Sequence, residues 1–522
     1  MTISGEIRVK KQLFPNIRQI LAYKWGKCYN QIKYDYHHYR LYPARDVMKI
    51  ISRKEEKKEL EYSERSKKSE LICVYGRRRV GKTFLVEQTF REFAFRAVGL
   101  EKGTAKQRLK SFGQRLIEYG DDIRTAPKNW FEAFSRLDKI LSMDSVRRSP
   151  NGKKIVFLDE FPWFATKRSD FLVAFEDFWN RRGTLDGDLV FIICGSATSW
   201  IIKNVIRNTG NMYQRVTKKI CIEPFTLAET EAFFKDREFD WSREQIAECQ
   251  MIFGGLPFFF DLMNTSHSLA QNINRLLFDK DALYRDETKR LLEATLSESP
   301  VYGEILYKLS FAKYGIKKSR LQEETGTSNG TFGRAIQDLV DCGYIIEYKK
   351  KYEEYNPLYV QLMDPYLLFH YHYLSKEKRV DSYEDMVSDM GRYDNWRGQA
   401  FEILCFNNTE AIKSALGISG VKTESYPWYN SEDDKNERVQ IDMVIERADN
   451  ITNLCEIKYT NKPFEVDASY EQQLLRKRDI FKKKTGTSQA LKIILVSAKG
   501  LSGVAYTSYI ADVITLDDLF EG

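Results

Sequence analysis

Residues 76–83 read Gly-Arg-Arg-Arg-Val-Gly-Lys-Thr, which matches the pattern GxxxxGK[ST]. Glycines let a backbone curl so that successive N–H groups point at a phosphate, and the positive end of a following helix adds to the attraction. Lys82 would reach the β- and γ-phosphates, and the Thr83 hydroxyl would ligate Mg²⁺. The spacing therefore predicts an ATP and Mg²⁺ site made of Gly76, Arg77, Arg78, Arg79, Val80, Gly81, Lys82, Thr83 and Phe84.

Two acidic residues follow a second apolar run, Ile155-Val-Phe-Leu, as Asp159-Glu160. Carboxylates at the carboxyl end of a buried parallel strand face the edge where open α/β sheets bind ligands. We expect Asp159 to hold Mg²⁺ through water and Glu160 to polarise the attacking water. The pair predicts ATP hydrolysis in addition to ATP binding.

A third apolar run, residues 189–194, ends in Gly195-Ser196. The Ser196 hydroxyl could orient water near the γ-phosphate, or it could cap the following helix. Arg215 precedes the next apolar run and could stabilise transition-state charge, in cis or from a neighbouring subunit of a homo-oligomer. A solvated arginine at the start of a strand is the equal alternative.

Near the C-terminus, Asp442, Glu456 and Lys458 fall on two expected neighbouring strands. Side chains alternate along a strand, so Glu456 and Lys458 share a face. Asp442 and Glu456 would converge on a divalent cation, with Lys458 beside the metal-bound water and a scissile phosphate. Glu402, on an expected helix, could add a third metal ligand. The arrangement D-x13-E-x-K is that of the PD-(D/E)xK nuclease fold, although many domains of this fold bind without cutting.

The elements that would position these residues follow from hydrophobic periodicity. Apolar strands alternating with helices predict a parallel sheet covered on both faces. In this first part the expected strands are 71–75, 93–99, 154–158, 189–194 and 217–222, and the expected helices are 53–68, 82–92, 104–119, 129–142 and 170–182. Farther on, helices near 301–312, 317–325 and 330–342 precede strands 344–348 and 354–359, the pattern of a winged helix. The last part has expected helices 395–407 and 468–484 and expected strands 438–446, 452–458 and 491–496.

The fold class predicted is therefore α/β, with a P-loop AAA-type parallel sheet, a helical lid, a winged helix and a C-terminal restriction-endonuclease-like domain. The predicted segments are a basic aromatic leader 1–47, an ATPase core 48–225, a lid 226–298, a winged helix 299–360, a connector 361–389 and a nuclease-like domain 390–522. The leader is interpreted as a poorly ordered or misassigned extension in preference to an arm that grips nucleic acid.

The chain resembles the archaeal-type ATPase family, which is grouped with AAA+ and STAND-like NTPases. The resemblance lies in residues 75–83, Leu158-Asp-Glu160 and Cys194-Gly-Ser196, and Gly254-Gly-Leu-Pro257 is similar to the lid motif of the family. It implies an ATPase region over roughly 48–300, a following winged helix and a nuclease-like C-terminal domain. One departure is Gln214, since the family usually has glycine before the arginine at 215.

Composition excludes several other classes. With 43% hydrophobic and 30% charged residues and 12 prolines in 522 residues, the chain is neither disordered nor collagen-like. Eight cysteines without a CxxC pair and five histidines without HExxH argue against zinc and favour reduced thiols. No apolar run is long enough to span a bilayer, and the N-terminus lacks the apolar core of a signal peptide, so we expect a cytoplasmic protein without a membrane partner.

Two hypotheses remain. In the first, an AAA+ ATPase acts on DNA, and Arg334 and Gln337 on the third winged-helix helix could face a groove. In the second, ATP gates a STAND-like signalling or defence switch that lacks nuclease activity. The net charge of +8 does not decide between them, because nine basic and only three acidic residues lie in 1–47.

Overall fold

The computed structural model describes residues 50–521 except 167–168, 184–186, 208–214, 283, 297–298, 350–356, 431–436 and 504–507. The chain divides into two compact units, residues 1–50 and 51–522, and the second is described below. The leader predicted over 1–47 lies outside the described residues, as do Gln214 and the first residues of the strand expected at 354–359.

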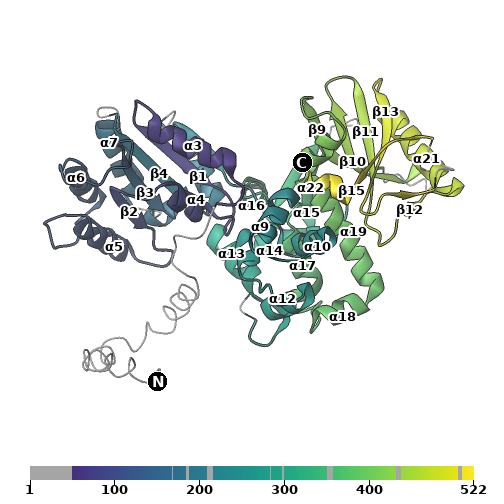
Figure 1. Cartoon of the computed structure of the whole chain (residues 1–522), viewed down its shortest axis with the longest axis horizontal. Helices are drawn as coiled ribbons and strands as arrows, with labels where there is room; N and C mark the ends of the chain where they lie inside the picture. Colours follow the sequence, from purple (N-terminus) through teal and green to yellow (C-terminus); the bar gives the residue numbers. More distant parts are fainter. Residues whose placement is uncertain are drawn as a thin grey trace, which may run out of the picture. The chain divides into compact units, whose positions relative to one another are not determined.

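Five parallel strands form the first sheet, in the order β2-β3-β4-β1-β5 (Figure 1). This confirms the predicted parallel sheet, with boundaries within two residues of those expected. The strands are β1 (Glu70–Tyr75), β2 (Phe95–Val98), β3 (Lys154–Asp159), β4 (Leu189–Gly195) and β5 (Lys218–Cys221), and the helices are α3 (Lys54–Arg65), α4 (Lys82–Thr89), α5 (Ala105–Glu118), α6 (Trp130–Leu141) and α7 (Phe171–Arg182).

Burial on both faces explains why these strands are continuous apolar runs. Every residue of β3 and β4 is buried, and helices α5, α6 and α7 pack aromatic side chains against the sheet. Helix α6 begins where Asn129 accepts a hydrogen bond from the Glu132 N–H at 2.9 Å, which satisfies a free amide of the first turn. Because β1 and β3 both run parallel to β4, their carboxyl ends lie at the same edge of the sheet.

The next part is helical, as predicted, and helices α9, α10 and α12 begin with capping residues. Thr226, Ser242 and Ser268 each form a capping box with the residue three positions on. The elements are α9 (Leu227–Asp236), α10 (Arg243–Phe253), α11 (Pro257–Asp261), α12 (Leu269–Ile273), the π-helix η5 (Asn274–Phe278) and α13 (Glu287–Thr295).

The segment 300–362, called here the three-helix unit, contains three helices and a three-stranded antiparallel sheet in the order β6-β8-β7. Its elements are α14 (Pro300–Ser310), β6 (Ile316–Lys317), α15 (Lys318–Thr325), α16 (Asn329–Asp341), β7 (Ile345–Lys349) and β8 (Leu358–Leu362). All three expected helices are present. Helical elements α17 (Pro365–Phe369), η6 (His370–Leu374) and α18 (Tyr383–Ser388) follow.

The C-terminal part is built on a mixed sheet in the order β15-β13-β11-β10-β9. The three strands predicted from the sequence, β10 (Val439–Arg447), β11 (Ile451–Lys458) and β13 (Ala490–Ser497), form its centre. The unpredicted strands β9 (Thr423–Asn430) and β15 (Ile510–Thr515) form its two edges. Its helices are α19 (Met390–Asn407), α20 (Thr409–Ala415), α21 (Ala468–Thr485) and α22 (Leu516–Phe520), and two short strands, β12 (Phe464–Glu465) and β14 (Leu501–Ser502), pair with each other.

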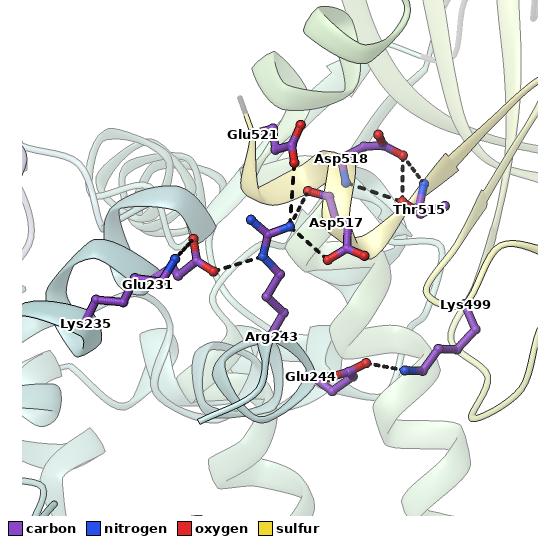
Figure 2. A network of polar contacts seen from close by, with 9 residues as sticks. All are labelled: Glu231, Lys235, Arg243, Glu244, Lys499, Thr515, Asp517, Asp518 and Glu521. Atoms are coloured by element: carbon purple, nitrogen blue, oxygen red, sulfur yellow. Dashed lines mark hydrogen bonds and ion pairs between the residues drawn. The ribbon is translucent and has the colours of Figure 1, made fainter. Parts of the chain in front are cut away.

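A polar network joins helix α22 to helices α9 and α10 (Figure 2). The Arg243 guanidinium lies 2.9 Å from carboxylate oxygens of both Glu231 and Asp517. The neighbouring Glu244 pairs with Lys499.

Among the described residues, no helix is long and apolar enough to cross a membrane.

Candidate nucleotide and carboxylate sites

The loop between β1 and α4 has the geometry that its glycines predict. Gly76 has φ +139°, and a Cβ added to it would lie 2.2 Å from the Ile222 carbonyl oxygen, so only glycine fits there. Gly81 has φ +92° at the N-cap of α4. The buried Lys82 ammonium donates to the carbonyl oxygens of Gly76 and Arg77 at 2.9 and 2.7 Å. The loop is therefore curled around the lysine that we expect to meet phosphate.

Thr83 and Asp159 meet at the same edge of the sheet. The Thr83 hydroxyl donates to Asp159 Oδ2 at 2.8 Å, although 76 residues separate them in sequence. Asp159 is buried, and its other oxygen accepts from the Glu160 N–H at 2.9 Å. A hydroxyl and a carboxylate oxygen in contact are the donor types that Mg²⁺ prefers, so these two residues fit the ion that accompanies ATP.

Glu160 and Ser196 contact each other beside this pair. The Ser196 hydroxyl donates to Glu160 Oε2 at 3.0 Å, and its backbone N–H lies 3.2 Å from the same oxygen. The residue that caps α8 (Thr198–Ile201) is Ala197, with no side-chain hydrogen bond, so Ser196 is not the capping residue, and its role in orienting water stays a prediction. Arg215 is exposed at the turn before β5.

Two arginines of the loop point away from the nucleotide position. Arg77 donates to the Cys342 carbonyl oxygen at 3.0 Å and to Asp364 Oδ2 at 2.5 Å, which joins the loop to both ends of the β7–β8 hairpin. Arg79 lies 2.8 Å from Glu287 Oε1 at the start of α13, and Glu287 is buried. Burial raises the pKa of Glu287 against the influence of the arginine. These side chains connect the loop to two neighbouring elements.

The remaining loop residues and the Gly-Gly-Leu-Pro motif complete this edge. Arg78 is half-exposed, with Glu101 3.9 Å away, and Val80 is buried. Gly254 caps α10 with φ +73°, and a Cβ added to Gly81 would lie 4.0 Å from Pro257. The motif at the helix break thus borders the phosphate loop.

At the C-terminal sheet, the structure brings the predicted charged residues together. Glu456 Oε1 lies 2.9 Å from Lys458 Nζ, so the two do share a face of β11. Asp442, at an irregularity of the β10–β9 pairing, accepts from the Ile457 N–H at 2.8 Å. Charge interactions link Asp442 to both Glu402 and Glu456, and all three carboxylates are buried.

Sequence reasoning missed four residues of this carboxylate cluster. Tyr470 and Lys477 of α21 donate to Glu456 at 2.7 and 2.5 Å, and Gln440 donates to Asp442 at 2.5 Å. Lys313 of the three-helix unit lies 2.7 Å from Glu402 Oε1. Gln440 lies two positions from Asp442 on β10, so strand alternation could have marked it in advance.

Burial and neighbouring charges shift the pKa values of the three acidic side chains in different directions. Burial and the charge of Asp442 raise the pKa of Glu402 to about 8, against the lowering influence of Lys313. Glu456 is also penalised by burial, but Lys477 and Lys458 outweigh that penalty and lower its pKa to about 2. Burial raises the pKa of Asp442, with Glu456 adding to the shift.

The acidic side chains of the cluster, in the contacts that they make in this structure, do not suit a divalent cation. Ammonium groups occupy two of the three acidic side chains, because Lys313 pairs with Glu402, and Lys458 and Lys477 pair with Glu456. Within the described ranges, no group of three or more His, Cys, Asp or Glu side chains is placed to hold a metal ion. The metal site on Glu402, Asp442 and Glu456 stays a prediction from sequence.

The parallel sheet, the curled glycine loop and the Thr83–Asp159 contact together define a P-loop nucleotide-binding fold. No protein-family model matches the chain. An uncharacterized protein of Methanocaldococcus jannaschii is 22% identical over 369 residues, which cover 68% of this chain and 75% of that protein.

Solved structures of low identity also resemble the chain. The Walker-type ATPase PABY2304 of Pyrococcus abyssi is 18% identical, with a TM-score of 0.43, and the match covers 64% of this chain and 99% of that one. The ORC2 protein of Aeropyrum pernix is 13% identical, with a TM-score of 0.34 over 63% of this chain and 95% of that one. A STAND protein of Pyrococcus horikoshii is 14% identical, with a TM-score of 0.29 over 72% and 49% of the two chains. The assignment to the P-loop nucleotide-binding fold rests on the geometry of β1, the phosphate loop and α4 in this chain.

Proposed function

We propose that the protein is a Mg²⁺-dependent ATPase of AAA+ type that acts on DNA. The observation that carries the proposal is the contact between Thr83 and Asp159 at 2.8 Å, beside Lys82 and Glu160. Phosphoryl transfer from ATP to water uses a lysine of the phosphate loop, a hydroxyl that binds the metal, an aspartate at the end of a nearby strand and a following glutamate. They lie at one edge of the sheet.

Each residue has a separate task in this proposal. The Lys82 ammonium exchanges its two backbone carbonyl partners for phosphate oxygens, and the loop N–H groups hold the β-phosphate. Mg²⁺ neutralises developing negative charge when it is bound with ATP. Glu160 orients and polarises the attacking water, and the Ser196 hydroxyl fixes the Glu160 carboxylate.

Two substitutions separate binding from hydrolysis. Lys82→Ala should lower the affinity for ATP at least about 100-fold, because the substitution removes a charge-assisted contact to phosphate. Glu160→Gln should keep ATP affinity within about threefold while the turnover rate falls about 100-fold or more. ATP affinity and phosphate release are measured on the full chain, with Lys110→Ala on the exposed side of α5 as the matched control. Wild-type ATPase activity in Lys82→Ala would refute the assignment.

We assign DNA contact to the three-helix unit, interpreted as a winged helix. Arg334 and Gln337 on α16 are exposed, and among the described residues each hydrogen-bonds within its own helix, to Gly330 and Asp341. Both side chains could leave these bonds for a groove at small cost. DNA should accelerate ATP hydrolysis by the full chain, and Arg334→Ala should reduce that acceleration without altering the basal rate.

A STAND-like switch is the second candidate, and one observation favours it. Helix α16 packs against α8 of the core, where Ser199 donates to Asp338 and Arg207 lies 3.5 Å from Asp341. A helix held by the core in this way would transmit nucleotide state. Slow turnover unaffected by DNA, with nucleotide-dependent oligomerisation, would select this candidate over the first.

A further inference from the structure

Lys313 belongs to the three-helix unit, yet its side chain enters the carboxylate cluster of the C-terminal sheet. It lies in the connection between α14 and β6. Its carbonyl oxygen accepts from Gln361 Nε2 at 3.1 Å, and the next carbonyl, that of Tyr314, accepts from the Tyr348 hydroxyl at 2.8 Å. Both donors lie on the sheet of the three-helix unit, so the backbone that presents Lys313 is fixed by its own unit.

The target of Lys313 is a carboxylate that is hidden from solvent. Its Nζ lies 2.7 Å from Glu402 Oε1, and the Glu402 side chain is only 7% exposed. Burial lowers the pKa of Lys313, but the charges of Glu402 and Asp442 outweigh that effect and raise it. A cation supplied by another part of the chain therefore sits where the sequence predicts a divalent metal.

The cluster contains as many basic as acidic side chains, without any metal. Three carboxylates, Glu402, Asp442 and Glu456, meet three ammonium groups, Lys313, Lys458 and Lys477. The Asp442 oxygens accept hydrogen bonds from the Ile457 N–H at 2.8 Å and from Gln440 Nε2 at 2.5 Å. A divalent ion would have to displace ammonium groups and strip hydrogen-bond donors from the same oxygens.

We propose that the carboxylate cluster is a docking site for Lys313, which fastens the three-helix unit to the C-terminal sheet, and that it is not a divalent-metal centre. The C-terminal part would then keep the arrangement of a nuclease-like fold while serving as a contact between two parts of one chain. The proposal is independent of ATP hydrolysis, which uses the other sheet.

The first experiment titrates Mn²⁺ alone into the nucleotide-free full chain, followed by the electron paramagnetic resonance signal of free Mn²⁺. Wild type and Asp442→Asn should bind Mn²⁺ equally, because any weak binding at Thr83 and Asp159 is common to both. A stoichiometric Mn²⁺ site in wild type that Asp442→Asn removes would overturn the proposal.

The second experiment tests the contact by a double-mutant cycle in thermal unfolding. Lys313→Met and Glu402→Gln should each lower the melting temperature, because each removes the 2.7 Å contact between the Lys313 ammonium and Glu402. The double variant should lose less than the sum of the two. Lys317→Met, an exposed lysine of the adjacent strand β6, should leave the melting temperature unchanged. Additive losses, or equal effects of Lys313→Met and Lys317→Met, would overturn the proposal.

Discussion

The contact between Arg77 and Asp364 allows a quantitative prediction. Arg77 is 11% exposed and Asp364 is 4% exposed, so Arg77→Met would leave a buried carboxylate without its cation. Removing one partner of a buried ion pair costs about 3–5 kcal/mol. Burial already raises the pKa of Asp364, so the carboxyl group can take up a proton when the arginine is lost, and the cost falls at about 3 kcal/mol.

That cost can be measured locally by amide hydrogen exchange. Asp364 Oδ1 caps helix α17 by accepting from the Leu367 N–H at 2.6 Å, so this amide reports on the contact. About 3 kcal/mol corresponds to roughly 100-fold faster exchange, since each 1.4 kcal/mol is tenfold. Arg77→Lys, which keeps the charge but loses the fork that also reaches Cys342, should show an intermediate increase.

Controls separate this contact from a general loosening of the loop. Arg78→Met removes a neighbouring arginine whose partner Glu101 is 3.9 Å away and half-exposed, and it should change Leu367 exchange by less than threefold. Adding Asp364→Asn to Arg77→Met should recover part of the loss, because no charge then remains buried. Equal exchange in wild type and Arg77→Met would refute the reasoning.

Three further predictions concern other parts of the chain. Burial lowers the pKa of His370 to about 4, so between pH 6.5 and 4 the unfolded chain binds a proton that the native chain does not, and stability falls as the pH falls through this window. Between pH 7 and pH 5, the free energy of unfolding of His370→Gln should therefore fall by about 2 kcal/mol less than that of wild type. Thermal unfolding at the two pH values measures this difference, and an unchanged pH dependence would contradict the prediction. Arg243→Ala, which breaks the network of Figure 2, should cost about 1 kcal/mol at 50 mM NaCl and almost nothing at 1 M, because the carboxylates it contacts are partly exposed. A loss that salt does not reduce would show that packing, not charge, holds α22. Gly76→Ala should abolish ATP binding, since its Cβ would lie 2.2 Å from the Ile222 carbonyl oxygen, whereas Gly330→Ala meets no atom within 4 Å and should bind ATP normally.

The strand, loop and helix around residues 76–83 could be predicted from the sequence because they are local. The loop, its preceding strand and its following helix are consecutive, and the Asp159 partner follows a strand with an unmistakable apolar run. The two strands of the C-terminal mixed sheet that were not predicted, β9 and β15, are the edges of that sheet. An edge strand needs less apolar sequence, and β9 even contains Pro427, which central strands exclude.

The carboxylate cluster could be predicted only in part, for a related reason. Glu456 and Lys458 are two positions apart on one strand, so alternation alone places them together. Lys313 is 89 residues from Glu402, and no periodicity or motif relates the two. The residue that decides whether the cluster can accept a metal is therefore the one that no local pattern could reveal.

The phosphate loop shows how one short segment can serve two purposes. The pattern GxxxxGK[ST] constrains the glycines, Lys82 and Thr83, and leaves the side chains at 77–79 free. In this chain Arg77 contacts Cys342 of the three-helix unit and Asp364 just beyond it, and Arg79 contacts Glu287 of α13. Phosphate binding acts on the backbone of the same residues. Any shift of that backbone on binding ATP is thus applied directly to two ion pairs, one on each neighbouring element, without an intermediate structure.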